Sequence, residues 1–532
     1  MADPIITAEI TGYSSASSTT VTSYFATQEF VSKAADTPAH LAFWARLKQP
    51  GRILRTIFDD GTTGGRSTTD FGLVTITNPD GALDSLLDYA YDSRQIKLRY
   101  GSTSLEYPSG WTEIFTGVAE QASYDLDVLE WRIRDRQLCL ELPVQTVRFA
   151  GTNVGPAGYE GTADDIGGTE KPRGWGHVIN VAPAPINEPR HVYGVNYDAA
   201  GAYAPVSQFA KIRDRTVDLS VGQDHATIAS LSATSINSGA AETVLSSGIF
   251  RLGAAPQGQV TCDVVFGTTS AERTVAQVYR SILLDYGYAT SEIASADIAA
   301  LDTANAAEIG VYVAGPETVT NLLDIVARSA GAWWSHDRNG TARIVRLEQP
   351  ASTPVATFKR FTVSTAAVKT DGDILQFDRV PLNDPGRGLP IWEAVVRYAF
   401  NNTIQTRDST ADANSSTGYK EYVSREYRNA VASASTVRVT HPLAVTFTTD
   451  TRLVNKTAAQ TEADRLLTLF RVRRDRYKIR AWVDPVTSET IDLGDTVRLE
   501  LPRFGLDSGK NFVVIGIESN YRRRKVTLDL WG

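Results

Sequence analysis

Apolar and polar residues alternate with a period of two over much of the chain, and this period is typical of half-buried antiparallel strands. The alternation is clearest in residues 95–100, 113–118 and 128–142, and it returns in residues 477–483. Turn residues separate such runs. Asn78-Pro79-Asp80-Gly81 is a turn with a physical basis, because Pro presets φ and Gly accepts a positive φ. The pattern predicts a mainly β protein.

The end of the chain continues this pattern. Residues 512–531 are typical of two strands around a turn, and they close on Trp531-Gly532 without a polar tail. Chain ends are usually polar and frayed. The apolar alternation up to Trp531 therefore predicts that the last strand is packed into a barrel or an assembly.

Helical spacing replaces alternation in three places. Residues 271–286 carry apolar side chains at helical intervals, with Ser270 as the expected N-cap. A second helix is expected after Gly315, with Pro316 at its first position. The third helix is expected over residues 458–470, where apolar side chains again form one stripe. These stretches predict short helices set among strands.

A hairpin is expected after the second helix. The segment Ala332-Trp333-Trp334 begins one strand, and residues 342–347 form the returning strand. Asn339-Gly340 between them is typical of a two-residue hairpin turn. Two helices followed by a hairpin predict an α+β module.

These patterns divide the chain into four segments. The expected fold is mainly β and multidomain, with two barrel-like antiparallel β modules flanking an α+β middle module. The segments are an N-terminal β module (1–150), a Gly/Pro-rich loop insert with returning strands (151–265), the α+β module (266–352) and a C-terminal β module that contains the helix 458–470 (353–532).

Composition narrows the class of protein. Lys and Arg number 53 and Asp and Glu 61, so the net charge is −8, whereas a domain that binds free nucleic acid is usually basic. The N-terminus lacks a basic region followed by an apolar stretch, and no apolar run approaches the ~18 residues of a membrane span. We therefore expect no signal peptide, no stable membrane insertion and synthesis in a cytoplasm.

Residues that carry chemistry are scattered. Cys139 and Cys262 are too few for a disulfide framework or a four-thiolate cluster, so buried free thiols are expected. No histidine belongs to a zinc-protease pair or a Cys/His ligand cluster, and the nearest two, His177 and His191, are better explained by loop hydrogen bonds than by a metal. Motifs of serine hydrolases, P-loops and dinucleotide-binding folds are missing. The histidines are His40, His177, His191, His225, His336 and His441.

Acidic residues gather in the Gly/Pro-rich stretch 150–190, which is expected to be a long ordered loop or a small irregular insert. Paired carboxylates there could serve glycoside cleavage or bind calcium through oxygen ligands, but an ordinary surface loop is the preferred interpretation. The same holds for residues 401–420, expected to be a solvated loop. We assign no catalytic, cofactor-binding or metal-binding residue. The acidic candidates are Glu160, Asp164, Asp165 and Glu170, and in the second loop Asp408, Asp412 and Asn414.

Basic residues and tryptophans allow two interpretations each. Basic runs can attract phosphates, but exposed strand positions paired with acids such as Asp475 and Glu518 are preferred. Tryptophans are expected to anchor the core or an interface instead of forming a sugar-binding platform. The basic runs are Arg471, Arg473, Arg474, Arg476, Lys478 and Arg480, and Arg522, Arg523, Arg524 and Lys525; the tryptophans are Trp175, Trp333, Trp334, Trp392, Trp482 and Trp531.

Several segments, taken in order, resemble the tail tip (baseplate) hub proteins of long-tailed phages and phage-like particles. None of these segments is specific by itself, but their order along most of the chain is specific. The segments include Asn78-Pro-Asp-Gly81-Ala-Leu-Asp84, Leu129-Glu-Trp-Arg-Ile-Arg-Asp135, Glu170-Lys-Pro172-Arg-Gly-Trp-Gly176, Phe250-Arg-Leu-Gly253, Ser329-Ala-Gly-Ala-Trp-Trp334, Leu493-Gly494-Asp495-Thr-Val497 and Val526-Thr-Leu-Asp-Leu-Trp531.

The resemblance implies a structural virion protein at the tail tip, made in the host bacterial cytoplasm. It implies a homotrimer whose two β modules per chain form a pseudo-sixfold ring, joining a tail tube or distal tail protein to a central fibre or spike. A tape measure protein would be a further partner, and genomic DNA would pass through the lumen without sequence-specific binding. Some relatives carry peptidoglycan-cleaving domains or an iron–sulfur cluster; these features are not carried over, because no domain signal is present and the cysteines are too few.

Two alternatives belong to other classes. The first is a tail-associated hydrolase that acts on the cell wall or a surface glycan, with Glu160, Asp164 and Asp165 as its best residues. The second is a cell-surface glycan-binding β protein, against which the missing secretion signal argues.

Overall fold

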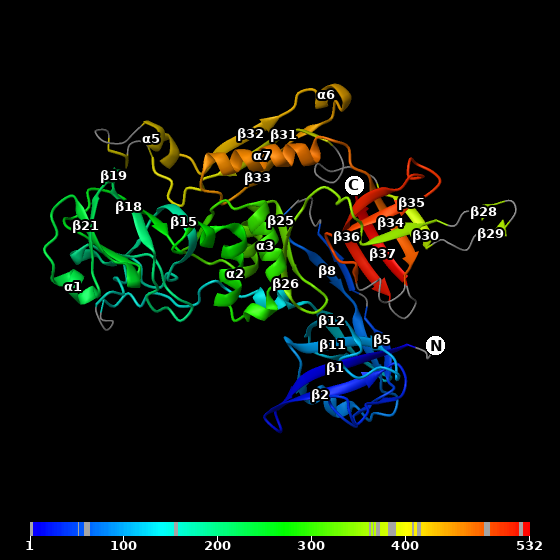
Figure 1. Cartoon of the computed structure of the whole chain (residues 1–532). Coiled ribbons are helices and arrows are strands. Elements are labelled where there is room, and N and C mark those ends of the chain that lie inside the picture. Colours follow the sequence, from blue (N-terminus) through cyan, green and yellow to red (C-terminus); the bar gives the residue numbers. More distant parts are fainter. Residues whose placement is uncertain are drawn as a thin grey trace.

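The computed structural model of the chain confirms a mainly β, multidomain fold with two half-barrel sheets and an α+β middle module (Figure 1). The sheets fall in separate regions of the molecule and several have hydrophobic cores of their own. The segment boundaries given above stay predictions. The structure describes residues 4–51, 53–57, 64–153, 158–360, 363–364, 367–368, 373–380, 390–406, 409–411, 417–483, 490–520 and 525–532.

The N-terminal sheet is open and antiparallel. Its strands follow the order β10-β1-β11-β12-β14-β9-β5, with β2 added on β1 and β13 on β14. Trp131 and Ile96 are among the buried side chains of its core. The bounds are β1 Ile5–Ser14, β2 Thr19–Ala26, β5 Leu47–Pro50, β9 Leu73–Thr77, β10 Tyr89–Ala90, β11 Arg94–Gly101, β12 Thr112–Ala119, β13 Ser123–Tyr124 and β14 Val128–Arg134.

The Gly/Pro-rich segment was predicted as a loop over 150–190, and this prediction is wrong for its second half. Residues Arg173–Val181 form β15, which lies between β23 (Val260–Val265) and β24 (Gly310–Val313) in one sheet. Seven of its nine residues are buried, so no alternation marks it as a strand. A second sheet holds β16 Ala184–Asn187, β17 Val192–Gly194, β20 Ser220–Asp224, β21 Ala240–Val244 and β22 Ile249–Leu252.

The α+β module contains three described helices instead of the two expected. The first, α2, begins at Val275 and not at Ala271, because Ser270–Arg273 form a separate 3-10 turn and Thr274 is the N-cap. The extra helix, α3, was not predicted. The described bounds are α2 Val275–Asp285, α3 Ser295–Ala304 and α4 Val319–Arg328.

The predicted hairpin is present, but its turn is longer than two residues. Strands β25 (Ala332–His336) and β26 (Ala342–Arg346) pair from one end to the other. Asp337 accepts the backbone amides of Asn339 and Thr341 at 2.8 and 2.9 Å, so the carboxylate closes the loop. Gly340 supplies the positive φ of 78° that this loop needs.

A three-stranded sheet and one long helix form a separate layer beside the middle module (Figure 1). The helix, α7, spans Lys456–Phe470 and confirms the expected helix 458–470. The strands are β31 (Ile391–Tyr398), β32 (Arg428–Ser433) and β33 (Val445–Asp450). Their Ala394 and Val396 side chains are buried in the same core as α7.

The expectation of a solvated loop over 401–420 is only partly right. Asn401 is 2% exposed and donates to the carbonyl oxygens of Val423 and Arg425, while Gln405 is also buried. The helix α5 (Thr417–Val423) follows. Asp408, Asp412 and Asn414 lie outside the described residues.

The C-terminal sheet has the path β27-β35-β36-β37-β34-β30. The last strand, β37, lies between β36 and β34, and Trp531 is fully buried. The prediction that the closing strand is packed is therefore confirmed. The bounds are β27 Ala356–Lys359, β30 Ile374–Arg379, β34 Arg476–Trp482, β35 Thr496–Glu500, β36 Lys510–Asn520 and β37 Lys525–Trp531.

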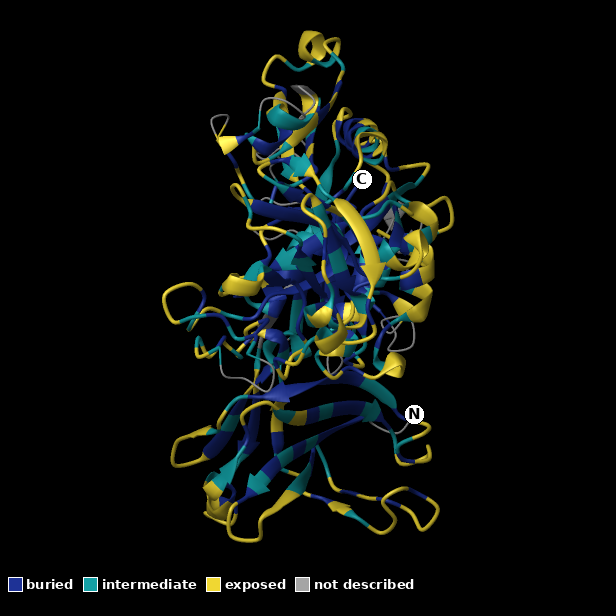
Figure 2. Ribbon diagram, turned by 90° about the vertical axis from the view of Figure 1, so that its left-hand side faces the viewer, coloured by how far each residue is buried: buried dark blue, intermediate teal, exposed yellow. Residues whose placement is uncertain are grey.

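One strand from the N-terminal part crosses into this C-terminal sheet. Strand β6 (Ile53–Thr56) pairs with β36 and with β8 (Thr68–Phe71). Nearby, β7 (Gly65–Arg66) pairs with β25 of the hairpin. The N-terminal module is otherwise set apart from the rest of the molecule, with buried strands inside and exposed loops at its lower edge (Figure 2). Among the described helices, none combines the length and the apolar character that a bilayer crossing needs.

Candidate functional site: a charged junction between the β modules

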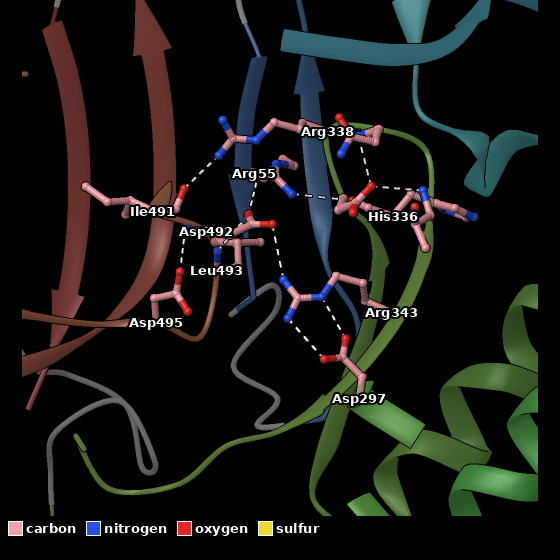
Figure 3. Close-up of polar contacts among 12 residues, drawn as sticks. Arg55, Asp297, His336, Arg338, Arg343, Ile491, Asp492, Leu493 and Asp495 are labelled. Atoms are coloured by element: carbon pink, nitrogen blue, oxygen red, sulfur yellow. Dashed lines mark hydrogen bonds and ion pairs between the residues drawn. The ribbon is translucent and has the colours of Figure 1, made fainter. Parts of the chain in front are cut away.

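The crossing strand contributes Arg55 to a largely buried cluster of charged residues, in which the Asp492 side chain is 16% and the Arg343 side chain 21% exposed (Figure 3). Arg55 comes from β6, Arg338 and Arg343 from the hairpin, Asp297 from α3, and Asp492 from the turn before β35. Segments from the N-terminal part, the middle module and the C-terminal module thus meet at one place. This arrangement makes the cluster the candidate site for holding the modules in a fixed geometry. We call it the junction cluster.

Asp492 is the centre of the junction cluster. The Arg55 guanidinium donates to one carboxylate oxygen, and Arg343 Nη1 lies 3.2 Å from the other. Burial alone would raise the pKa of Asp492, but the charges of Arg55 and Arg343 outweigh burial and hold that pKa below its ordinary value. Asp492 is therefore a mostly buried anion with two cationic partners.

Arg343 extends the cluster to the helix layer. Its Nε donates to Asp297 Oδ2 at 2.7 Å, and its Nη2 lies 3.3 Å from Asp297 Oδ1. Burial lowers the pKa of Arg343, but the hydrogen bond and charge of Asp297 more than compensate, so the pKa lies above its ordinary value. Planar two-point pairing of this kind fixes geometry as well as charge.

Arg338 connects the hairpin loop to both β modules. Its Nη2 donates to the Ile491 carbonyl oxygen at 2.9 Å, on the C-terminal side. Its own carbonyl oxygen accepts the backbone amide of Thr116, in β12 of the N-terminal sheet, at 2.6 Å. The loop thus touches the N-terminal sheet directly, through the main chain.

A neutral histidine lies beside the cluster. His336 is 1% exposed, and its Nε2 is 2.9 Å from the Tyr288 hydroxyl. Burial, with a smaller contribution from Arg136, lowers the pKa of His336 to about 3. The imidazole is uncharged at neutral pH, so the arginines of the junction cluster do not face a further cation.

The junction cluster is suited to holding the modules in one relative geometry. Buried ion pairs cost desolvation and often add little stability, but breaking one by removing a single partner is strongly destabilising. A junction built from such pairs has one favoured geometry, because any displacement leaves an unpaired buried charge. The chemistry of the junction cluster is therefore that of a rigid joint.

Part of this site carried a sequence signal. The motif Leu493-Gly494-Asp495 forms the turn next to Asp492, where Asp495 Oδ2 accepts the Asp492 amide at 2.7 Å. Gly494 has φ 89°, and a β-carbon there would lie 3.2 Å from Trp333 Cζ2. Asp492 itself and Arg55 were missed, because nothing local links residues so far apart in the sequence.

Three of the four acidic candidates of the 150–190 segment have a partner of their own. Glu160 accepts from Lys171 Nζ at 3.0 Å, Asp165 accepts from the Thr162 hydroxyl, and Glu170 pairs with Arg148 at 2.6 Å. Asp164 is exposed. No group of three or more His, Cys, Asp or Glu side chains suited to a metal occurs within the described ranges.

The histidine and cysteine candidates do not converge. His177 Nδ1 lies 3.6 Å from Glu308, while His191 ends a 3-10 turn with a positive φ. Cys262 is buried as expected, whereas Cys139 is only half-buried. Burial raises the pKa of both thiols.

Four residues of the first basic run behave as the preferred interpretation predicts, whereas Arg474 donates to the Leu469 carbonyl oxygen and lies over the Trp531 ring. Lys478 and Arg480 are exposed on alternate positions of β34, Arg476 Nε donates to Asp529 at 2.8 Å, and Arg473 lies 3.8 Å from Asp475. Residues 522–524 of the second run lie outside the described residues.

Most tryptophans are core anchors, as predicted. Trp175, Trp333, Trp334 and Trp531 are each at most 6% exposed. Trp482 is not a core residue, because it is 45% exposed and lies under the Lys525 ammonium group at 4.7 Å from the ring centroid, so its predicted role at an interface stays a prediction.

Comparison with known proteins gives structural matches only. Neither models of known protein families nor curated proteins match the chain. A tail protein from Neisseria meningitidis is 11% identical, with 100% of this chain and 97% of that chain covered and a TM-score of 0.38. A 43 kDa tail protein of prophage MuSo2 from Shewanella oneidensis is 9% identical over 92% and 96%, with a TM-score of 0.33.

A third match is a chain of the virion of a native gene transfer agent particle. It is 13% identical, covers 69% of this chain and 85% of that chain, and has a TM-score of 0.41. The chain is similar to phage tail proteins.

Proposed function

We propose that the chain is the hub of a tail tip or baseplate in a long-tailed phage or phage-like particle. In this role it is a non-enzymatic virion protein. As a homotrimer it adapts a sixfold tail tube or distal tail protein to a threefold central fibre or spike, and its ring forms a conduit for DNA ejection. The tape measure protein is a further proposed partner.

The proposal is supported mainly by two open sheets held in one chain by the junction cluster. The N-terminal path ends at β5 and β10, and the C-terminal path ends at β27 and β30; in the described part of the chain none of these four strands pairs with a further strand on its outer side. One backbone hydrogen bond, from the Asp373 amide just before β30 to the Lys359 carbonyl oxygen of β27 at 2.8 Å, joins the two ends of the C-terminal path. Unpaired sheet edges are templates for pairing with another chain. Two half-barrels at a fixed angle suit a ring in which neighbouring chains cover the edges.

The experiment is to determine the oligomeric state and the position in particles. Native mass spectrometry of the purified chain and cryo-electron microscopy of particles should give a trimer at the tail tip. A persistent monomer that is absent from particles would overturn the proposal.

The hydrolase alternative has a direct test of its own. Zymography on cell-wall material with the wild type and with Glu160→Gln, Asp164→Asn and Asp165→Asn variants should give no clearing that depends on these carboxylates. Clearing by the wild type that disappears in the variants would replace the structural role by an enzymatic one.

A further inference from the structure

A cavity of about 580 Å³ lies between the N-terminal sheet and the C-terminal sheet. Small-molecule sites have volumes of ~300–1,000 Å³ and occur at domain interfaces and in the mouths of β-barrels. The wall on the N-terminal side is apolar, with Ile6, Leu98, Ile114 and Phe115 each at most 4% exposed. Ile517 of β36 lines the opposite side. The cavity therefore has the size of a small-molecule site and one apolar wall, while much of the remaining lining is polar.

Most charged groups in the lining already have partners. Arg55 and Arg338 donate to the C-terminal module in the junction cluster. Asp135 accepts a backbone amide at 3.0 Å in the 3-10 turn that follows it, and Asp337 closes the hairpin loop. These groups do not need a ligand to balance their charge.

Lys48 is different from the other charged lining residues. It is exposed on β5, and within the described residues its ammonium group has no hydrogen-bond or ion-pair partner. Gln49 and Asn520, which are also exposed, lie in the same lining and mark the open end of the cavity with Lys48. A cation at the mouth of a cavity with one apolar wall complements a molecule with an anionic head and a hydrocarbon tail.

We propose that this cavity binds a single-chain amphipathic carboxylate of the fatty-acid class. The hydrocarbon chain lies against Leu98 and Ile114, and the carboxylate lies at the mouth beside Lys48. Burial of the chain provides most of the affinity, since affinity for apolar matter scales with the area removed from water. The ion pair at the mouth sets the orientation.

The test is a fluorescence titration of the full chain with cis-parinaric acid and with its methyl ester, which lacks the charge. The wild type should bind the acid saturably, at one molecule per chain. Lys48→Met should weaken binding of the acid by ~5-fold, as expected for a partly exposed ion pair, and leave binding of the ester unchanged. Lys97→Met, on β11 next to Leu98 but outside the cavity lining, is the matched control and should change neither affinity.

A cavity-filling variant gives a second readout. Ile114→Trp should abolish binding of both probes while its circular dichroism stays that of the wild type. If this variant does not fold, the comparison of acid and ester on Lys48→Met decides alone. Lack of saturable binding by the wild type would overturn the proposal. So would equal affinity of the wild type and Lys48→Met for the acid, or equal weakening of acid and ester.

Discussion

Asp475 and Gly532 exchange two backbone hydrogen bonds, from the Asp475 amide to the Gly532 carbonyl oxygen at 2.7 Å and from the Gly532 amide to the Asp475 carbonyl oxygen at 3.0 Å. They continue the pairing of β34 with β37, whose register runs from Arg476↔Trp531 to Trp482↔Lys525. The last residues are thus part of an internal strand with neighbours on both sides.

Deletion of residues 526–532 should therefore prevent folding of the C-terminal sheet, because it removes the strand between β34 and β36. We expect loss of the trimer in native mass spectrometry and loss of infectivity of particles. Intact, infectious particles carrying the truncated chain would contradict the prediction.

Trp531→Ala should lower the free energy of unfolding by about 3–5 kcal/mol, because it empties a fully buried aromatic site. Trp482→Ala is the matched control, since Trp482 is 45% exposed and should cost about 1 kcal/mol or less. Urea unfolding followed by circular dichroism measures both. Equal losses in the two variants would show that Trp531 is not a core anchor.

Arg55→Met should destabilise the protein by about 3 kcal/mol, because it leaves the mostly buried Asp492 carboxylate with one fewer cation. The control is Lys211→Met, whose pair with Asp218 is about half exposed on both sides and should cost less than about 1 kcal/mol. Denaturant titrations compare the two. If the Arg55 variant were no less stable than the Lys211 variant, the junction cluster would not hold the modules together.

His336 should make stability depend on pH below neutrality. The pKa of His336 is about 3 in the folded protein and ~6.5 in the unfolded chain, so only the unfolded chain takes up the proton between these values. Its contribution is complete above pH 6.5 and is lost by about 1.4 kcal/mol per pH unit as the pH falls toward 3. His336→Gln keeps an acceptor for the Tyr288 hydroxyl. Its free energy of unfolding should fall by about 1.4 kcal/mol less per pH unit than that of the wild type. Urea titrations from pH 7 to pH 4 test this, and parallel curves for the two proteins would refute it.

Gly340→Ala should cost more stability than Gly287→Ala. Both glycines have a positive φ, 78° and 85°, so both substitutions strain the backbone by about 1–2 kcal/mol. A β-carbon at Gly340 would also lie 3.2 Å from Arg136 Cδ and 3.3 Å from the Thr116 carbonyl oxygen, whereas nothing lies within 4 Å at Gly287. Thermal unfolding of the two variants measures the difference. Equal shifts would mean that the hairpin loop does not press on the N-terminal sheet.

Local signals in the sequence predicted the elements that depend on local structure. The stripe over 458–470 predicted α7, and the alternation up to Trp531 predicted β37. The helix α3 was missed because only Ile298 and Leu301 are buried in it, which is too few for a visible stripe. The strand β15 was missed because burial on both faces removes the alternation.

The junction cluster depends on contacts that no local pattern encodes. Arg55 and Asp492 are 437 positions apart, and the register that joins β6 to β36 is set by packing of distant segments. The motif Leu493-Gly494-Asp495 indicated the turn next to Asp492, but nothing in the sequence indicated that Asp492 pairs with Arg55. Sequence reasoning therefore found the elements and the turn, and it missed the pairing that joins them.

The path of β6 also has a consequence for inheritance. Recombination could replace the C-terminal half of the chain by that of a related chain. The new half would then lack its own β6, the strand that pairs with β36, and its Asp492 would lack the Arg55 with which it evolved. Exchanges that preserve the fold must move residues 53–56 together with the C-terminal half. A single recombination breakpoint within 57–491 separates residues 53–56 from the C-terminal half and should therefore be selected against. The two ends of the coding sequence should thus share one ancestry even where the middle does not.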